Sequence, residues 1–200
     1  MRSTTLEKNS FLIRLRASAA WLVRLLHPWY SNMAVLTDER TTHAERIEHS
    51  AQVRRICFVC TGNTCRSPMA EAVANDLASK REGKETFEAY SAGLYANEGE
   101  PISSNAIRAL ELAEVVPSKR DYHAHTAHSL TAQEAEEYDL LIGMTGAHCM
   151  ELMMRFPALA QKITCMPTPI TDPYGGDLTV YRACLSEITS GVRALIGAEE

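Results

Sequence analysis

Short apolar runs and longer amphipathic stretches alternate along the last three quarters of the chain. The apolar runs end in turn-forming residues and predict buried strands at 53–60, 86–91, 138–144 and 163–166. The stretches between them have helical spacing and predict helices at 67–80, 103–113, 147–156 and 178–196. Strands that alternate with helices favour one parallel sheet with helices on both faces. We therefore expect a three-layer αβα fold of the α/β class, with a central four-stranded parallel sheet.

The first fifty residues follow a different pattern. Between residues 11 and 30 apolar positions recur at helical spacing, and arginines fall on the other faces. Such a basic amphipathic helix suits peripheral contact with an anionic membrane surface or docking of a partner helix. It could equally pack on the parent domain, or result from a start codon misread upstream of Met33. Residues 36–52 are polar and mixed in charge, so we expect an N-terminal extension at 1–52 and a folded domain at 53–200.

Composition and charge narrow the class of protein. An apolar content of 46% with ordinary glycine and proline usage is typical of one soluble globular domain with an appendage. The formal net charge is −5, and residues 1–32 contain five Lys or Arg residues against one Glu, so the rest of the chain is acidic. An acidic body without a basic stripe argues against a nucleic-acid partner.

The number and spacing of the cysteines indicate the cellular compartment of the protein. Six of them, at 57, 60, 65, 149, 165 and 184, are too few and too irregularly spaced for a secreted disulfide framework. Reduced thiols and a cytoplasmic location are therefore expected. The most apolar uncharged window near the N-terminus, 17–23, is shorter than a membrane span, so no transmembrane helix is expected.

The segment "CTGNTCRSPMAE", residues 60–71, lies where the first predicted strand ends and the first helix begins. Ser67 is expected to cap this helix, with Pro68 at its first position. Ligands of parallel sheets bind beyond the carboxyl ends of the strands, where Cys60 should lie. Cys57 and Cys60 have the spacing of zinc ligands, but on a strand they point to opposite faces. We expect Cys57 in the core and no metal.

An anion site explains more of these residues. Consecutive backbone N–H groups and the start of a helix create a positive field at such a loop. Gly62 supplies backbone freedom, and Asn63 can hold the loop through its side chain. Arg66 offers a fork for two phosphoryl oxygens. We therefore expect a phosphate-binding loop after the first strand. The same field favours the thiolate form of Cys60, which makes it a nucleophile, and Ser67 can donate its hydroxyl to that thiolate.

Phosphoryl transfer through a covalent intermediate also needs a proton donor and a base. The segment "TDPYGGD", residues 171–177, supplies a carboxyl group, Asp172, in a turn fixed by Pro173 and two glycines. By itself this turn is common and carries little weight.

Taken together, these residues resemble the low-molecular-weight protein tyrosine phosphatases. The resemblance rests on "FVCTGNTCRSPMAEA", on "SAG" at 91–93, on "DLLIGMT" at 139–145 and on "DPYGG" at 172–176. It implies that Cys60 attacks phosphorus, that Arg66 and the 61–67 backbone hold the oxygens, and that Asp172 protonates the leaving group and then activates water. It implies phosphorylated proteins as partners and no cofactor. The expected phosphate- or substrate-binding residues are Thr61, Gly62, Asn63, Thr64, Cys65, Ser67, Tyr95 and Tyr174.

Within the family, the sequence is most similar to the bacterial protein arginine phosphatases. Phosphotyrosine enzymes usually carry an aliphatic residue where Thr64 stands, and two adjacent aromatics after Asp-Pro, where this chain has Tyr174 and Gly175. A hydroxyl suits the N–H groups of a guanidinium, whereas an aliphatic wall packs a flat phenol. Tyr95 would remain as one wall of the cleft. A phosphoarginine substrate is thus favoured, with phosphotyrosine as the alternative.

Two further signals have competing interpretations. Cys65 is either a buried thiol or, as the resemblance favours, a partner that forms a reversible disulfide with Cys60 and protects it from over-oxidation. His123, His125 and His128 lie in a polar segment before a predicted capped helix at 129–139, so solvent-facing or capping roles are favoured over metal binding.

Two other function classes compete with the phosphatase. Arsenate reduction uses a thiolate in a similar loop but needs further cysteines to pass a disulfide outward, and Cys149, Cys165 and Cys184 are expected on separate elements with no close pair. A non-catalytic phosphate-binding or redox-sensing module is the other class. The combination of a nucleophile, an arginine fork and a proton donor argues against it.

Overall fold

A computed structural model describes residues 55–81 and 87–197 of the chain. The extension at 1–52, with its predicted amphipathic helix at 11–30 and the membrane contact inferred from it, lies outside the described residues. Among the helices that are described, none combines the length and the apolar character needed to cross a membrane.

The centre of the fold is a parallel sheet of four strands in the order β2-β1-β3-β4. These strands are β1 (Arg55–Cys60), β2 (Glu88–Gly93), β3 (Leu140–Gly143) and β4 (Ile163–Cys165). Cys60, the last residue of β1, pairs with Gly93, the last residue of β2. The carboxyl ends of these central strands therefore meet at one edge, which is where ligands of such sheets bind.

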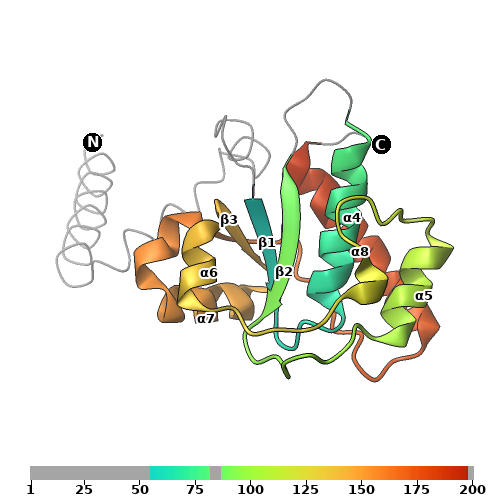
Figure 1. Cartoon of the computed structure of the whole chain (residues 1–200), viewed down its shortest axis with the longest axis horizontal. Coiled ribbons are helices and arrows are strands. Elements are labelled where there is room, and N and C mark those ends of the chain that lie inside the picture. Colours follow the sequence, from blue (N-terminus) through green and yellow to red (C-terminus); the bar gives the residue numbers. More distant parts are fainter. Residues whose placement is uncertain (1–54, 82–86, 198–200) are drawn as a thin grey trace, which may run out of the picture. The chain divides into compact units, whose positions relative to one another are not determined.

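Helices cover both faces of the sheet (Figure 1). On one face lie α4 (Arg66–Ser79), α5 (Ser104–Leu112) and α8 (Leu178–Ile196), and on the other lie α6 (Ala132–Glu137) and α7 (Gly146–Arg155). Two short 3-10 helices are η1 (Tyr122–Ala124) and η2 (Pro157–Lys162). The expected three-layer αβα fold with a four-stranded parallel sheet is thereby confirmed.

The central strand β1 supplies side chains to two cores. Ile56 and Phe58 pack with α4 and α8, while Cys57 and Val59 pack on the opposite face with residues of α7. Because both faces of β1 are buried after its first residue, its sequence from Ile56 to Cys60 is apolar throughout instead of alternating. Cys57 is a core residue, as expected, and Cys60 lies at the edge where β1 ends.

The start of α4 differs from the prediction. The helix begins at Arg66, with Cys65 as the preceding residue, and it has no side-chain cap. Ser67 is therefore wrong as the cap, and Pro68 stands in the first turn, two residues after the helix begins. The hydroxyl of Ser67 points back to Cys60 and to the carbonyl of Ala92. The prediction of a capped helix at 129–139 is correct, because Thr131 and Glu134 form a capping box at the start of α6.

Candidate active site

Residues 60–67 run from the end of β1 into the first turn of α4 and are called the 60–67 loop. Flanking segments hold this loop through hydrogen bonds to its backbone carbonyl groups. Four of these carbonyls accept hydrogen bonds from flanking segments: Cys60 O from Leu94 N–H, Thr61 O from Tyr95 N–H, Asn63 O from His125 Nε2 and Thr64 O from Ser103 N–H, all at 2.8–2.9 Å. Across a trans peptide the C=O and the next N–H point in opposite directions. The N–H groups that follow these carbonyls therefore face the inside of the 60–67 loop, as an anion site requires.

Asn63 holds the 60–67 loop in shape. Its side-chain amide donates to Ser67 Oγ and to Ser91 Oγ at 3.0 Å each, and its Oδ1 accepts from His128 N–H at 3.1 Å. This is the role that the sequence predicts for Asn63. The backbone freedom assigned to Gly62 is a wrong prediction, because the residue with a left-handed backbone is Asn63, at φ 56°. Asparagine is among the few residues that tolerate this conformation.

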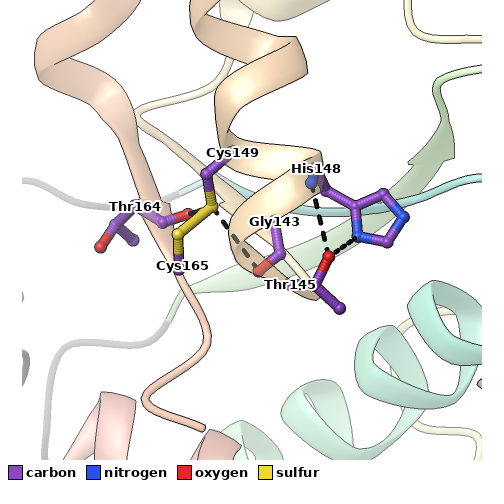
Figure 2. The surroundings of a disulfide bond; sticks show 6 residues. All are labelled: Gly143, Thr145, His148, Cys149, Thr164 and Cys165. Atoms are coloured by element: carbon purple, nitrogen blue, oxygen red, sulfur yellow. Dashed lines mark hydrogen bonds between the residues drawn. A yellow bond between two sulfur atoms is a disulfide. The ribbon is translucent and has the colours of Figure 1, made fainter. Parts of the chain in front are cut away.

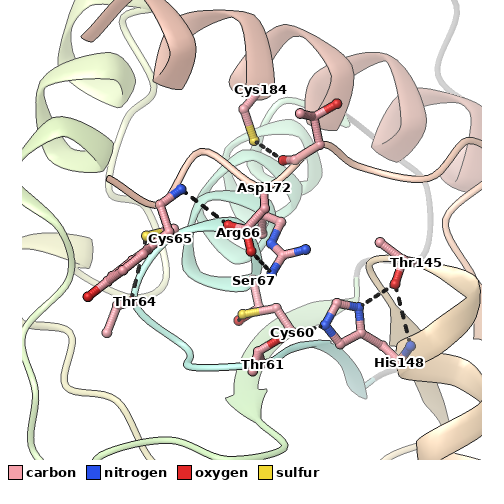
Figure 3. A network of polar contacts seen from close by, with 12 residues as sticks. Cys60, Thr61, Thr64, Cys65, Arg66, Ser67, Thr145, His148, Asp172 and Cys184 are labelled. Atoms are coloured by element: carbon pink, nitrogen blue, oxygen red, sulfur yellow. Dashed lines mark hydrogen bonds and ion pairs between the residues drawn. The ribbon is translucent and has the colours of Figure 1, made fainter. Parts of the chain in front are cut away.

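The sulfur of Cys60 lies inside the 60–67 loop and is almost fully buried. Ser67 Oγ is 3.0 Å from it (Figure 3). The backbone N–H of Asn63 donates to it at 3.3 Å. The Ser67 hydroxyl has one hydrogen and also lies 3.3 Å from Ala92 O. A thiolate is the stronger acceptor of the two because it is charged, so the ionised sulfur would draw this hydrogen.

Arg66 and Asp172 meet at the mouth of the 60–67 loop. Arg66 Nη2 is 2.7 Å from Asp172 Oδ2, with the guanidinium side chain 8% exposed and the carboxylate 53% exposed. Arg66 Nε is buried and has no hydrogen-bond partner among the described residues. A buried N–H without a partner is costly, and an oxyanion bound in the loop would satisfy it.

Asp172 is held by the turn that the sequence predicts. Its Oδ1 accepts from Tyr174 N–H at 3.2 Å, and Gly175 has a left-handed backbone at φ 77°. Gly176 N–H donates to Pro173 O at 2.9 Å and closes the turn. One carboxylate oxygen thus faces Arg66 while the other is tied to the turn.

A cavity of about 290 Å³ opens above Cys60. Most of the predicted site residues line it, namely Cys60, Thr61, Gly62, Thr64, Cys65, Arg66, Tyr95, Asp172 and Tyr174. Asn63 and Ser67 are buried behind this surface and support it. Asn97 and Glu100 also line the cavity, and no sequence motif predicts them because only their position in the loop after β2 brings them there.

Two tyrosines stand at the rim of the cavity. Tyr95 donates its hydroxyl to Glu151 Oε1 at 2.7 Å, and the guanidinium of Arg155 lies over its ring at 4.2 Å from the centroid. Helix α7 therefore fixes the Tyr95 ring. Tyr174, on the 171–177 turn, is 77% exposed and is followed by a glycine. This side of the rim therefore has one aromatic side chain.

Cys65 faces the cavity beside Thr64. Its Sγ lies 3.1 Å from the Tyr181 hydroxyl and 3.6 Å from Thr64 Oγ1. Burial raises the pKa of the Cys65 thiol. At neutral pH it is therefore a protonated neighbour of Cys60 and not a second thiolate.

The three clustered histidines do not behave alike. His123 is exposed and contacts Asp121 and Glu111, as a solvent-facing residue should. His125 has the second of the two expected roles, because it is the partly buried C-cap residue of η1. Its Nε2 contacts the Asn63 carbonyl at 2.9 Å, and burial lowers its pKa. His128 supports Asn63 through its backbone. In the described part of the chain, no group of three or more His, Cys, Asp or Glu side chains could hold a metal ion.

A second polar cavity, of about 370 Å³, lies behind Asn63 and is lined by both His125 and His128. At its wall Ser91 donates to Glu71 Oε2 at 2.6 Å, and Arg120 Nε donates to Glu71 Oε1 at 2.7 Å. Through the Ser91 contact with Asn63, this chain of hydrogen bonds reaches the loop around Cys60. No sequence motif predicts these hydrogen bonds, since Glu71 and Ser91 become neighbours only when α4 packs on β2.

The cysteines give a second correction. Cys149 of α7 and Cys165 of β4 form a disulfide, with Cα atoms 6.0 Å apart, whereas no close pair was expected among the later cysteines (Figure 2). The prediction of uniformly reduced thiols is therefore wrong for this pair. The pairing depends on β3 and β4 being neighbours in the sheet, which spacing along the chain does not reveal.

Comparisons with known proteins find relatives over most of the described part of the chain. A family model described as low molecular weight phosphotyrosine protein phosphatase matches residues 55–200. A protein-arginine-phosphatase of Bacillus subtilis is 32% identical over 147 residues, covering 70% of this chain and 93% of that protein. A probable low molecular weight protein-tyrosine-phosphatase EpsP of Ralstonia nicotianae is 30% identical, covering 72% and 94%. The crystal structure of a low molecular weight protein tyrosine phosphatase from T. tengcongensis matches with a TM-score of 0.66 at 36% identity, covering 73% and 99%.

Proposed function

Because the chain belongs to the low-molecular-weight phosphotyrosine protein phosphatase family, and is thus a cysteine-based protein phosphatase, we propose that it hydrolyses phosphoarginine in proteins. In this proposal Cys60 is the nucleophile, Arg66 and the 61–67 backbone bind the phosphoryl oxygens, and Asp172 is the acid and base. The catalytic domain spans 53–200, and the cytoplasm remains its predicted location.

The position of the Thr64 side chain is the observation that favours phosphoarginine over phosphotyrosine. Its side chain lines the cavity with the hydroxyl near Cys65 Sγ, at the level of the 60–67 loop where the leaving group would pass. A guanidinium carries several N–H groups that need acceptors, and a buried N–H left without one costs about 1–3 kcal/mol. An aliphatic side chain at this position would offer no acceptor and would suit a phenol ring.

The charge and shape of the rim support the same substrate. Asp172 and Glu100 place two carboxylates around the cavity, and a guanidinium leaving group is positively charged once protonated. Tyr174 is the one aromatic of its turn because Gly175 follows it, so a tyrosyl ring would have less surface to stack on. The relatives named as protein-arginine-phosphatases are consistent with this choice.

In the first step, the Cys60 thiolate attacks phosphorus, an S–P bond forms and the bond to the leaving nitrogen breaks. The phosphoryl oxygens accept hydrogen bonds from the loop N–H groups and from Arg66, including the Nε that no other described residue contacts. They displace the Asp172 carboxyl from Arg66, which it contacts at 2.7 Å. Away from Arg66 and beside the phosphoryl charge, the released carboxylate takes up a proton from solvent and gives it to the nitrogen as the N–P bond breaks, so the product leaves as an arginine guanidinium.

In the second step, water attacks the phosphocysteine. Asp172, now ionised, accepts a proton from the water, an O–P bond forms and the S–P bond breaks. Inorganic phosphate leaves and the Cys60 thiolate is restored, stabilised by the Ser67 hydroxyl at 3.0 Å. The sequence of steps balances with water as the co-reactant.

Phosphotyrosine is the second candidate, because relatives named as tyrosine phosphatases match the chain at similar identity. Arsenate reduction is disfavoured on a new ground. The Cys149–Cys165 pair exists, but it packs in the core on the face of the sheet opposite to Cys60, so the two sulfurs of the pair are not positioned to receive a disulfide from Cys60.

The proposal is tested by the Thr64→Ile variant, with Thr64→Ser as the matched control that keeps the hydroxyl. We expect Thr64→Ile to lower kcat/KM on a phosphoarginine peptide by about tenfold or more, as the loss of one hydrogen bond to a charged group predicts, while activity on a phosphotyrosine peptide holds or rises. If Thr64→Ile lowers both activities equally, Thr64 does not select the leaving group.

A further inference from the structure

A histidine outside all the sequence motifs contacts the 60–67 loop. His148 stands in the first turn of α7, and its side chain is buried. Its Nε2 lies 3.0 Å from Thr61 Oγ1, and its Nδ1 lies 2.7 Å from Thr145 Oγ1 (Figure 3). One imidazole thus connects the hydroxyl next to Cys60 with the hydroxyl that caps α7.

The position of this imidazole is fixed by its neighbours. The hydroxyl of Thr145 accepts the backbone N–H of His148 at 3.4 Å as the helix cap. The next residue, Cys149, is bonded to Cys165 at the end of β4 (Figure 2). A Cβ atom at Gly143 would lie 2.6 Å from Cys149 Sγ, so α7 packs directly on the backbone of β3. The turn of α7 that carries His148 is therefore fixed against the sheet.

Two tautomers of the His148 ring fit its contacts with Thr61 and Thr145. Burial, with the nearby Arg66 charge as a second cause, lowers the pKa of His148 to about 4, so the ring is neutral at pH 7 and carries one N–H. In the tautomer with the imidazole hydrogen on Nε2, the ring donates to Thr61 Oγ1 and the Thr145 hydroxyl, which accepts the backbone N–H of His148, donates its own hydrogen to Nδ1 at 2.7 Å. This tautomer is favoured because it gives the Thr145 hydrogen an acceptor.

We propose that His148 is a positioning residue that orients the Thr61 hydroxyl so that its hydrogen points into the cavity and donates to a phosphoryl oxygen. This inference rests on the proposed function, in which the cavity above Cys60 binds the phosphoryl group.

The location of Thr61 fits this role. It directly follows Cys60, and its side chain lines the cavity that Cys60 and Arg66 also line. A hydroxyl that accepts a hydrogen bond from Nε2–H cannot donate to the same nitrogen, so its hydrogen is available on the cavity side. The contact adds one side-chain donor to the backbone N–H groups that face the oxyanion.

The experiment measures the Kd of inorganic phosphate by titration in the full chain. Thr61→Val removes the hydroxyl and is expected to weaken phosphate binding about tenfold, the low end for a hydrogen bond to a charged group. Thr61→Ser keeps the hydroxyl and should bind within about twofold of the wild type. His148→Phe keeps a ring but loses the N–H, and we expect about a fivefold loss that His148→Gln, whose amide can replace Nε2–H, largely restores.

Coupling between the two residues decides the mechanism. If His148 acts through Thr61, the double variant Thr61→Val/His148→Phe binds phosphate no more weakly than Thr61→Val alone. Additive losses in the double variant, or an unchanged Kd in His148→Phe, would overturn the proposal.

One further test uses the wild-type chain alone and therefore does not require any variant to fold. The ¹⁵N chemical shifts of the His148 ring report its tautomer, and we expect the hydrogen on Nε2. A hydrogen on Nδ1 would mean that Thr61 donates to His148, and the proposal would be wrong while the proposed function could stand. If phosphate does not bind the wild type at the cavity, the proposed phosphate site is wrong and both proposals fail together.

Discussion

At the scale of single residues, the surroundings of Cys60 depend on Asn63 and Ser67. Both lie in the segment that also contains Cys60, so the sequence alone predicts that Asn63 holds the loop and that Ser67 faces the sulfur, although it also assigns Ser67 a cap that α4 lacks. The groups that hold Asn63 in its left-handed conformation, Ser91 and His128, come from β2 and from the segment before α6. Their contribution depends on how distant segments pack and could not be predicted from local spacing.

Asp172→Asn tests the acid and base. Because an amide neither donates an acidic proton nor accepts one, we expect kcat to fall by roughly 10²–10⁴-fold. Phosphate should bind equally or more tightly, since the carboxylate that contacts Arg66 at 2.7 Å no longer competes for it. Steady-state kinetics and a phosphate titration check both parts. A variant with normal kcat would remove Asp172 from the mechanism.

Substitution of Cys65 tests whether this residue protects the Cys60 nucleophile from irreversible oxidation. We expect peroxide to inactivate the wild type and a thiol reductant to restore it, because a Cys60–Cys65 disulfide stops oxidation at a reversible stage. Cys65→Ala should recover less activity than the wild type, whereas Cys184→Ala, a matched change at a buried free cysteine, should recover normally. Equal recovery in Cys65→Ala would contradict this role.

At the scale of elements, the alternation of strands and helices predicts the sheet, its helices and the loop after β1. Two features were missed because they depend on tertiary packing. The start of α4 is set by Cys65 and Arg66, since Ser67 turns its hydroxyl to Cys60 instead of capping the helix. The link between α7 and β4 depends on the position of β4 beside β3 in the sheet.

The disulfide between α7 and β4 should stabilise the fold. It joins residues 16 positions apart, and closing a loop of this size in the unfolded chain is worth roughly 3 kcal/mol. A reductant is expected to lower the free energy of unfolding in urea by about this amount in the wild type and in Cys184→Ala. Cys165→Ala should show no response to reductant. Identical wild-type unfolding curves with and without reductant would show that the bond contributes nothing.

At the scale of the whole molecule, His148 links the stability of the fold to pH. Its pKa in the folded chain is about 4, below the ordinary value of 6.5, because burial and the charge of Arg66 disfavour the protonated ring. Asp172 acts in the opposite direction but does not cancel these causes. The unfolded chain therefore binds a proton at His148 between pH 6.5 and 4 that the folded chain does not, and this contribution to stability is lost as the pH falls through that range.

We expect the free energy of unfolding of the wild type to fall by roughly 3 kcal/mol more than that of His148→Gln between pH 7 and pH 4. Glutamine does not titrate, so carboxylates that change charge in the same range affect both proteins alike. Urea unfolding at a series of pH values measures the difference. Parallel pH dependences in the two proteins would show that His148 is not held neutral.

The central claim is tested most directly by the ratio of kcat/KM on two peptides of the same sequence, one carrying phosphoarginine and one carrying phosphotyrosine, with the wild-type chain. The hydroxyl of Thr64 and the carboxylates of Asp172 and Glu100 line the cavity that receives the leaving group, so we predict a clear preference for phosphoarginine. Equal rates, or a preference for phosphotyrosine, would contradict the assignment.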